Sequence, residues 1–340
     1  MVTDARILQI LRRGPANGAE IATRLGVTRQ AVNLHLKNLV REGTVVKQGR
    51  TRGAVFALAS GRPKPGRDRQ FRTRRRLINL EEDKIFGEID ISMNLKRELQ
   101  KGAWDIAQYA FTEMLNNAIE HSHARECRVE AGLDNYEFCF IVRDFGIGVF
   151  ASIAKNYEFK SEEEAVGELI KGKTTTMPKG HTGEGIFFTS KAADVLALRS
   201  HRLELLYDNR KADVFLGRKR HIRGTEVRFS LSRNSRRRIE KVFAAYAPEE
   251  FDYQFQRTRV HVKLFREALV SRSEAKRLLA GLDRFKEIVL DFHGVNSLGQ
   301  GFADEVFRVF RARHPEVKIE TQNLNPAVSA MIRHVLDNSK

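Results

Sequence analysis

The segment 111–122, FTEMLNNAIEHS, sets polar side chains at a helical repeat inside an apolar stretch. Glu113, Asn117 and His121 recur at every fourth position, so in a helix they share one face, and the apolar residues between them occupy the other side. A polar stripe along a helix that packs on a core is costly unless it lines a cavity. The sequence therefore predicts a fold in which this helix borders a ligand-binding hollow.

A second motif follows a strand-like apolar run at 138–142. The sequence Arg143–Val149, RDFGIGV, sets the carboxylate of Asp144 beside Gly146 and Gly148. Glycines let a backbone approach a flat ligand closely. We therefore expect this turn to contact the ligand of the hollow.

A third motif, GHTGEG at 180–185, opens an apolar helix. Free N–H groups at a helix N-terminus, together with the helix dipole, favour phosphate binding. The polar segment 171–179 before it is expected to act as a lid, whose lysines Lys171, Lys173 and Lys179 could reach a terminal phosphate or remain in solvent. The three motifs together predict a phosphate-containing ligand.

In this order, the motifs resemble the ATPase fold shared by gyrase, the 90-kDa heat-shock chaperones, histidine kinases and MutL (the GHKL, or Bergerat, fold). Gly224 and Thr225, which precede a strand-like run at 226–231, extend the resemblance, and no P-loop sequence occurs. The resemblance implies ATP and Mg²⁺ as cofactors. It implies nucleotide-binding roles for Asn117, His121, Asp144, Gly146, Gly148, Lys173, Gly180, Gly183, Gly185 and Thr225.

Within that resemblance, Asn117 holds Mg²⁺, Asp144 accepts a hydrogen bond from the adenine amino group, and Thr225 supports Asp144. Glu113 occupies the position of the catalytic general base, although kinase members retain a glutamate there without hydrolysing freely. His121 either approaches the phosphates or supports a neighbouring residue. Residues 61–110 contain no histidine, so a sensor histidine kinase with an upstream phosphoacceptor is disfavoured.

Charge is distributed unevenly along the chain. Of the net charge of +17, residues 1–80 contribute +14, with 18 Lys and Arg against 4 Asp and Glu. Such a concentration favours a polyanionic partner, with nucleic acid first and an anionic membrane surface second. Apolar stretches are too short for a transmembrane helix, and two cysteines cannot form a disulfide framework, so we expect a cytoplasmic protein without a membrane span.

The N-terminal 60 residues predict three helices, with Thr28 as the N-cap of the third, followed by a basic hairpin. This pattern resembles the winged helix-turn-helix of bacterial regulators, although such domains also serve as protein–protein modules. The resemblance implies binding of double-stranded DNA, with Arg29 and Gln30 as the main base readers. The full set of expected DNA contacts is Thr28, Arg29, Gln30, Asn33 and Lys37 on the third helix and Lys47, Arg50 and Arg52 on the wing.

The C-terminal block alternates strand, polar turn, helix, strand and helix, which predicts a small α/β unit. It resembles a STAS-type domain, the fold of anti-sigma-factor antagonists. In antagonists the turn after the strand holds a phosphorylated serine. Here glycines at 299 and 301 occupy that stretch, and the nearest hydroxyl, Ser297, is offset. This unit is therefore expected either to be switched by phosphorylation or to dock on the ATPase domain, on another copy of the chain or on a protein partner.

The sequence thus predicts a multi-domain α+β chain. Its expected parts are a winged helix at 1–60, a basic linker at 61–80, a Bergerat-fold α/β sandwich at 81–235 and a STAS-like α/β domain at 240–340. A second basic patch, at 233–238, predicts either DNA tracking or a solvated loop.

The favoured function is a DNA-binding regulator, in which ATP binding controls dimerisation or the binding of DNA or a partner. The alternatives are an anti-sigma-type serine/threonine kinase and a DNA-associated ATPase clamp. Whether the chain is an enzyme, either a Mg²⁺-dependent ATPase or a kinase, stays open at this point.

Overall fold

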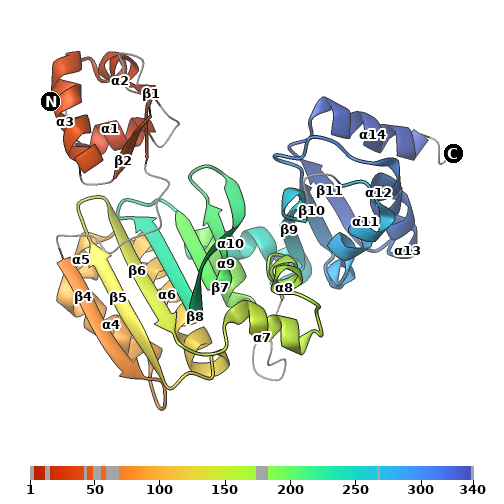
Figure 1. The fold of residues 1–340 in the computed structure, drawn as a ribbon, viewed down its shortest axis with the longest axis horizontal. Helices are drawn as coiled ribbons and strands as arrows, with labels where there is room; N and C mark the ends of the chain where they lie inside the picture. Colours follow the sequence, from red (N-terminus) through yellow and green to blue (C-terminus); the bar gives the residue numbers. More distant parts are fainter. Residues whose placement is uncertain are drawn as a thin grey trace. The chain divides into compact units, whose positions relative to one another are not determined.

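The computed structural model describes residues 4–11, 16–41, 44–48, 55–58, 69–173, 183–265 and 269–337. By contact density the chain divides into a first unit, Met1–Pro63 with Arg210–Ala212, called the N-terminal unit, and a C-terminal unit that holds Lys64–Asn209 and Asp213–Lys340. Figure 1 shows the two units and the succession of their elements. None of the helices in these ranges is both long enough and apolar enough to cross a membrane.

The N-terminal unit combines three helices with a small antiparallel sheet. The helices are α1 (Asp4–Leu11), α2 (Gly18–Leu25) and α3 (Arg29–Arg41), and the strands are β1 (Ala16–Asn17), β2 (Val45–Gln48) and β3 (Val55–Leu58), in the order β1-β3-β2. Asn17 and Glu20 form a capping box at the start of α2, and Gly26 ends it in the left-handed conformation. Buried Ile21 and Leu36 belong to its core. The expected winged-helix arrangement is confirmed.

A five-stranded antiparallel sheet forms the middle of the chain. Its strands are β4 (Arg69–Arg76), β5 (Glu126–Leu133), β6 (Glu137–Asp144), β7 (Val195–Asp208) and β8 (Asp213–Ser232), in the order β4-β5-β6-β8-β7. The buried aromatic residue Phe140 stacks on Phe229 of the neighbouring strand, with ring centroids 4.7 Å apart. Phe111 meets Phe140 edge-on at 5.3 Å, which brings the helix of the polar stripe against this face.

Helices cover that face of the sheet (Figure 1). The helices of this part are α4 (Glu82–Met93), α5 (Leu95–Glu98), α6 (Lys101–His121), α7 (Val149–Asn156), α8 (Glu162–Leu169), α9 (Gly185–Ala192) and α10 (Ile239–Tyr246). Helix α6 turns Phe111, Leu115 and Ala118 into the core. Its opposite side is therefore left to the polar stripe.

The C-terminal part is a three-stranded parallel sheet with helices around it. Strands β9 (Arg257–His261), β10 (Glu287–Asp291) and β11 (Lys318–Gln322) lie in the order β11-β10-β9. The helical segments are η1 (Glu249–Phe251), η2 (Val262–Leu264), α11 (Arg272–Leu279), η3 (Leu282–Arg284), α12 (Gln300–Asp304), the π-helix η4 (Glu305–Phe310), α13 (Arg311–Arg313) and α14 (Pro326–Asp337). The expected small α/β unit is confirmed.

The expectation of a basic linker over 61–80 is wrong for its second half. Residues 61–68 lie outside the described residues, but Arg69–Arg76 form β4, which pairs along its whole length with β5. The strand alternates exposed residues with half-buried ones, among them Phe71 and Thr73. An edge strand with one open face can carry many arginines, because their charges remain in solvent while the backbone pairs with its neighbour.

Candidate functional site

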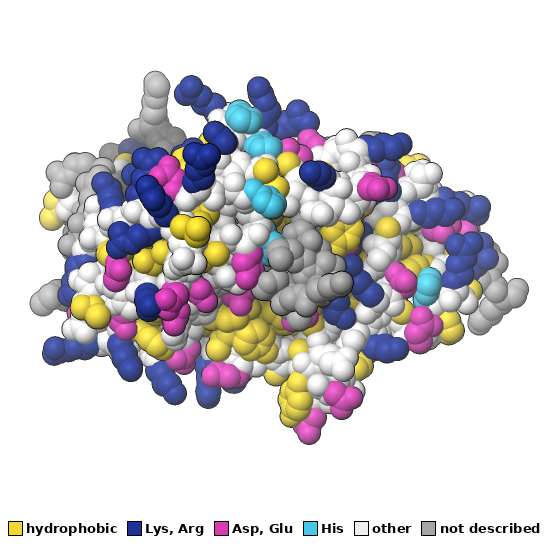
Figure 2. Space-filling model, turned by 90° about the horizontal axis from the view of Figure 1, so that it is seen from below, with side chains coloured by type: hydrophobic (Ala, Val, Ile, Leu, Met, Phe, Trp, Pro, Cys, Tyr) yellow, Lys and Arg dark blue, Asp and Glu magenta, His cyan; other side chains and the backbone are white. Residues whose placement is uncertain are grey.

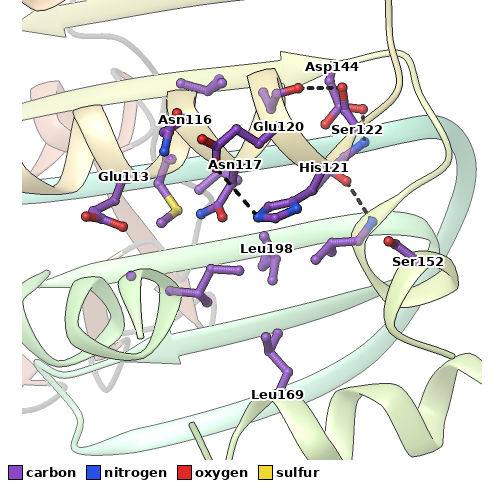
Figure 3. Close-up of a pocket in the computed structure, with 18 of the residues that line it drawn as sticks. Glu113, Asn116, Asn117, Glu120, His121, Ser122, Asp144, Ser152, Leu169 and Leu198 are labelled. Carbon is purple, nitrogen blue, oxygen red and sulfur yellow. Dashed lines mark hydrogen bonds and ion pairs between the residues drawn. The ribbon is translucent and has the colours of Figure 1, made fainter. Parts of the chain in front are cut away.

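A cavity of about 270 Å³ lies between α6, the end of β6, the middle of β8, and helices α7 and α9. This volume suits a small-molecule ligand rather than a few buried waters. Most of the residues predicted from the three motifs line it together: Glu113, Asn117, His121, Asp144, Gly148, Gly183, Gly185 and Thr225. Figure 3 shows Glu113, Asn117 and His121 in that order along the helix, with Leu169 and Leu198 across from them.

The polar stripe of α6 borders the cavity, as its spacing predicts. Nδ2 of Asn117 is buried and, within the described residues, has no hydrogen-bond partner. A buried amide N–H without a partner costs about 1–3 kcal/mol. Nε2 of His121 lies 3.9 Å from a carboxylate oxygen of Glu120, which also lines the cavity. The Asn117 amide group is thus held at a position where a polar ligand would satisfy it.

Asp144 ends β6 and is only 4% exposed. Its Oδ1 accepts hydrogen bonds from the backbone N–H groups of Gly146, at 2.9 Å, and Thr225, at 3.2 Å. Burial raises the pKa of the Asp144 carboxyl above its usual range, although these hydrogen bonds oppose the shift. The carboxylate is fixed in place by backbone donors from two elements and lines the cavity.

Thr225 connects the motifs across the site. Its backbone N–H donates to Asp144, and its Oγ1 accepts a hydrogen bond from the backbone N–H of Val149 at 2.9 Å. The start of α7 is thereby tied to β8 beside the carboxylate. The sequence prediction that Thr225 supports Asp144 agrees with this contact.

Two of the motif glycines are required by chain packing. A Cβ on Gly146 would lie 1.8 Å from the carbonyl oxygen of Ser122, and Gly224, at φ +74°, would place one 2.4 Å from the carbonyl oxygen of Asp144. No side chain fits at either point, whatever the ligand. Gly146 is expected to contact the ligand, but it is not among the residues that line the cavity. It lets the end of α6 pass close to the turn after β6.

Gly185 lies at the N-terminus of α9 beside Glu113. A Cβ there would lie 1.9 Å from Oε2 of Glu113. Gly183 and Glu184 line the cavity with it, so the first turn of α9 faces the hollow, as the motif predicts. The first glycine of the motif, Gly180, lies outside the described residues.

Two lysines of the expected lid segment, 171–179, lie away from the cavity. Lys171 is 3% exposed, and its Nζ donates to Oε2 of Glu168 at 3.2 Å and to the carbonyl oxygen of Ala280 at 2.7 Å. Burial lowers the pKa of its ammonium group. Neither expected placement of Lys171, at a phosphate or in solvent, agrees with the structure, because its ammonium is buried and hydrogen-bonded inside the C-terminal unit.

Lys173 is also placed outside the cavity. Its Nζ lies 4.7 Å from the centroid of the Phe285 ring and 3.4 Å from the carbonyl oxygen of Arg284. Burial lowers the pKa of this ammonium as well. The structure thus places the ammonium of Lys173 against Phe285 and Arg284 and not at the cavity wall, and Lys179 lies outside the described residues.

Sequence reasoning missed part of the cavity wall. Asn116 and Glu120 belong to the same helix as the stripe but fall outside its four-residue repeat. Leu169 comes from α8 and Leu198 from β7, and both line the hollow. Glu184 carried a signal, since it lies within the glycine motif at 180–185. For the leucines no local pattern distinguishes a cavity wall from an ordinary core.

The expected DNA-contact surface of α3 is largely accessible. Thr28, Arg29, Gln30 and Lys37 are exposed, Asn33 is half-buried, and Lys47 on β2 is exposed. Thr28 also caps the helix, since its Oγ1 accepts a hydrogen bond from the backbone N–H of Ala31 at 3.3 Å. Arg50 and Arg52 of the wing lie outside the described residues.

Two arginines of the second basic patch, residues 233–238, form contacts that stabilise the end of the sheet. Arg233 donates to the carbonyl oxygen of Asp134 at 3.1 Å and forms an ion pair with Glu98. Arg237 pairs with Asp194 at 2.6 Å. Two arginines of the patch thus fasten the end of β8 to neighbouring loops, which limits its use as a nucleic-acid surface.

In the C-terminal part, Ser297 is exposed in the loop between β10 and α12. Gly299 is the N-cap of α12, and a Cβ there would lie 2.6 Å from the carbonyl oxygen of Val270. A serine at the antagonist position would meet this backbone. The loop is therefore built around glycine in place of a phosphorylated side chain.

Comparison with protein families identifies the two ends of the chain. Residues 2–46 match a model described as winged helix-turn-helix DNA-binding, and residues 274–329 match a STAS-like domain of unknown function (DUF4325). No curated protein matches the chain. The N-terminal unit is thus a winged helix-turn-helix of the DNA-binding kind, which supports a DNA-binding regulator, and the chain ends in a STAS-like domain.

Proposed function

We propose that the chain is a DNA-binding transcription regulator whose middle domain, of the GHKL type, binds ATP and Mg²⁺. Nucleotide binding in the α6 cavity would control dimerisation, DNA binding or the binding of a partner protein by the STAS-like domain. A ligand can shift such an equilibrium only by binding one state more tightly than the other. The proposal therefore predicts different DNA affinities with and without nucleotide.

The observation that carries the proposal is the cavity itself. One hollow gathers Asn117, with its buried and unpartnered Nδ2, the fixed carboxylate of Asp144, and the first turn of α9. These groups match the metal, base and phosphate ends of a nucleotide in the GHKL pattern. A polar ligand in the cavity would give this amide the hydrogen-bond partner that it lacks among the described residues.

The donor set fits both cofactors. Mg²⁺ prefers oxygen ligands and is usually bound through one or two protein groups together with substrate phosphates and waters. Oδ1 of Asn117 would supply such an oxygen, and when bound the cation would neutralise phosphate charge. Asp144 would accept from the adenine amino group, and the N–H groups at the start of α9 would receive phosphate oxygens.

The experiment follows the γ-phosphate. Pure protein is incubated with γ-labelled ATP and Mg²⁺, with and without duplex DNA, while DNA affinity and oligomeric state are measured in parallel. Label that stays in bound ATP, together with a nucleotide-dependent change in DNA affinity or oligomeric state, is the expected result. Identical DNA affinity and oligomeric state with and without ATP·Mg²⁺ would refute the coupling.

A second candidate, an ATPase clamp, draws support from Glu113. Its carboxylate lines the cavity beside Gly185, at the end where phosphates would lie, which suits a general base for water. Release of free phosphate that duplex DNA stimulates would favour the clamp. Transfer of the label to protein would favour the kinase.

A further inference from the structure

The helix-free face of the middle sheet carries a row of arginines. In the register of the sheet, Arg74 lies opposite Arg128, Arg128 opposite Arg143, Arg143 opposite Glu226, and Glu226 opposite Arg199. Residues directly opposite one another in antiparallel strands point to the same face. One row across all five strands thus holds four arginines and a single glutamate.

The neighbouring rows of this face add to the positive charge. Next to the first row, Arg72 lies opposite Glu130, and Arg228 opposite Ile141; on the other side, Arg76 lies opposite Glu126. We call this surface the arginine face. It comprises Arg72, Arg74, Arg76, Arg128, Arg143, Arg199 and Arg228, with Glu126, Glu130 and Glu226 among them.

The glutamates orient part of the arginine face without neutralising it. Glu130 pairs with Arg128 at 2.6 Å, and Glu226 pairs with Arg228 at 2.8 Å. Seven arginines against three glutamates leave an excess of four positive charges. Exposure is greatest toward the β4 edge, where the side chains of Arg74 and Arg128 are 66% and 52% exposed.

Figure 2, the view from below, shows Lys and Arg side chains along its upper border, among histidines and some Asp and Glu side chains. Exposed guanidinium groups suit phosphate oxygens, because the planar fork of arginine offers paired N–H donors. A flat arrangement on a sheet offers charge and hydrogen bonds to a backbone but no reading of base edges in a groove.

We propose that the arginine face binds the phosphate backbone of the duplex DNA held by the winged helix-turn-helix. Ten residues, 59–68, join the end of β3 to the start of β4. Such a connection spans at most about 35 Å. DNA on the N-terminal unit is therefore at high effective concentration for the arginine face, so a weak second contact adds to affinity. The inference rests on DNA binding by the N-terminal unit.

The test measures the affinity of the full chain for a 30-base-pair mixed-sequence duplex. Fluorescence anisotropy gives this affinity over a range of salt concentrations. The variant changes Arg74, Arg76 and Arg128 to Gln. The matched control changes Arg311, Arg313 and Arg333, which are exposed in the STAS-like part, to Gln. Both remove three positive charges, so net charge alone cannot explain a difference between them.

We expect the arginine-face variant to lose about 10- to 100-fold in affinity at low salt. Its slope of log affinity against log salt should also become shallower by about 0.9 for each lost phosphate contact, while the control changes little. Replacing the same three arginines by Lys keeps the charge but not the paired N–H donors, so this variant should retain most of the salt slope and lose part of the affinity. Equal behaviour of the arginine-face and control variants would overturn the inference, as would a Lys variant whose salt slope is as shallow as that of the Gln variant.

A parallel variant separates DNA binding by α3 from DNA binding by the arginine face. Changing Arg29 and Gln30 to Ala removes the expected base readers and leaves the arginine face intact. If this variant binds the same 30-base-pair duplex as tightly as the parent does, DNA binding through Arg29 and Gln30 fails, whatever the arginine face does. If the arginine-face variant instead loses binding to phosphatidylserine vesicles and keeps full DNA affinity, the surface serves a membrane, and the inference is overturned.

Discussion

At the scale of single residues, Asp144 combines two roles that can be separated. Its Oδ1 receives backbone N–H groups from Gly146 and Thr225, while the carboxylate as a whole lines the cavity. An asparagine in its place still offers one oxygen to those donors. It loses the negative charge that would attract an adenine amino group. The substitution should therefore keep the backbone hydrogen bonds around residue 144 and weaken ligand binding.

We therefore expect Asp144→Asn to weaken ATP binding by about 10- to 100-fold, the range for a hydrogen bond to a charged group. Isothermal titration with ATP·Mg²⁺ measures this, with the exposed Asp252→Asn as control. ATP affinity equal to that of the control would contradict the role of Asp144.

The same substitution should stabilise the protein without ligand at neutral pH. Burial raises the folded-state pKa of Asp144 above its unfolded value, so the folded state binds the proton more tightly. The free energy of unfolding therefore falls as the pH rises from the unfolded-state pKa to the folded-state pKa of this carboxyl. Above the folded-state pKa, the full loss remains. We expect Asp144→Asn to melt above the parent at pH 7 and to approach it in acid. A lower melting temperature at pH 7 would contradict this assignment of charge.

Among the elements, β4 shows best how a sheet can use a segment that composition alone assigns to a linker. Its backbone completes the edge of the sheet beside β5, and Arg75 on its helix-facing side pairs with Glu88 of α4 at 2.8 Å. A chain that begins at residue 69 should therefore keep the C-terminal unit folded. One that begins at residue 77 exposes the edge of β5 and should aggregate or melt far earlier.

Thermal unfolding and size-exclusion chromatography of the two truncated chains check this prediction. Equal stability of the two would show that β4 is dispensable. The comparison isolates one strand, since the two truncated chains differ by eight residues, 69–76.

The same strand shows where sequence reasoning ends. Local patterns sufficed for α6, whose repeat of Glu113, Asn117 and His121 predicts a cavity wall, and for Gly26, which ends α2. They failed for β4, because eight residues with five arginines look unable to pack, and the pairing that stabilises them comes from β5, some fifty residues away. They failed for Lys171 and Lys173 for a similar reason, since their partners lie beyond residue 250 or on α8.

For the whole molecule, contacts of α8 and of residues 171–172 after it join the middle and STAS-like parts within the C-terminal unit. Arg284 donates to Oε1 of Glu168 at 2.6 Å and to the carbonyl oxygen of Gly172 at 3.0 Å. Thr258 Oγ1 donates to the carbonyl oxygen of Lys171 at 2.6 Å. The C-terminal unit should thus unfold in one calorimetric transition that spans both parts.

Replacing Arg284 by Ala removes one ion-pair partner of Glu168, which is 6% exposed and retains Lys171 at 3.2 Å. Removing one partner of a buried carboxylate destabilises the folded state. We expect a lower melting temperature and a separation of the transition into two, with the exposed Arg277→Ala as control. Two transitions in the unaltered protein would contradict a single body.

The placement of the two cysteines has a practical consequence. Cys127 and Cys139 are both fully buried, Cys127 lies opposite Asp144 in the sheet, and burial raises the pKa of its thiol to about 11. A thiol reagent can reach them only when the sheet opens, because a buried and protonated sulfur does not react. In the unaltered chain, the rate at which a thiol reagent modifies these cysteines therefore reports how often the sheet opens near the strand that ends in Asp144. A ligand that binds the Asp144 carboxylate should lower that rate.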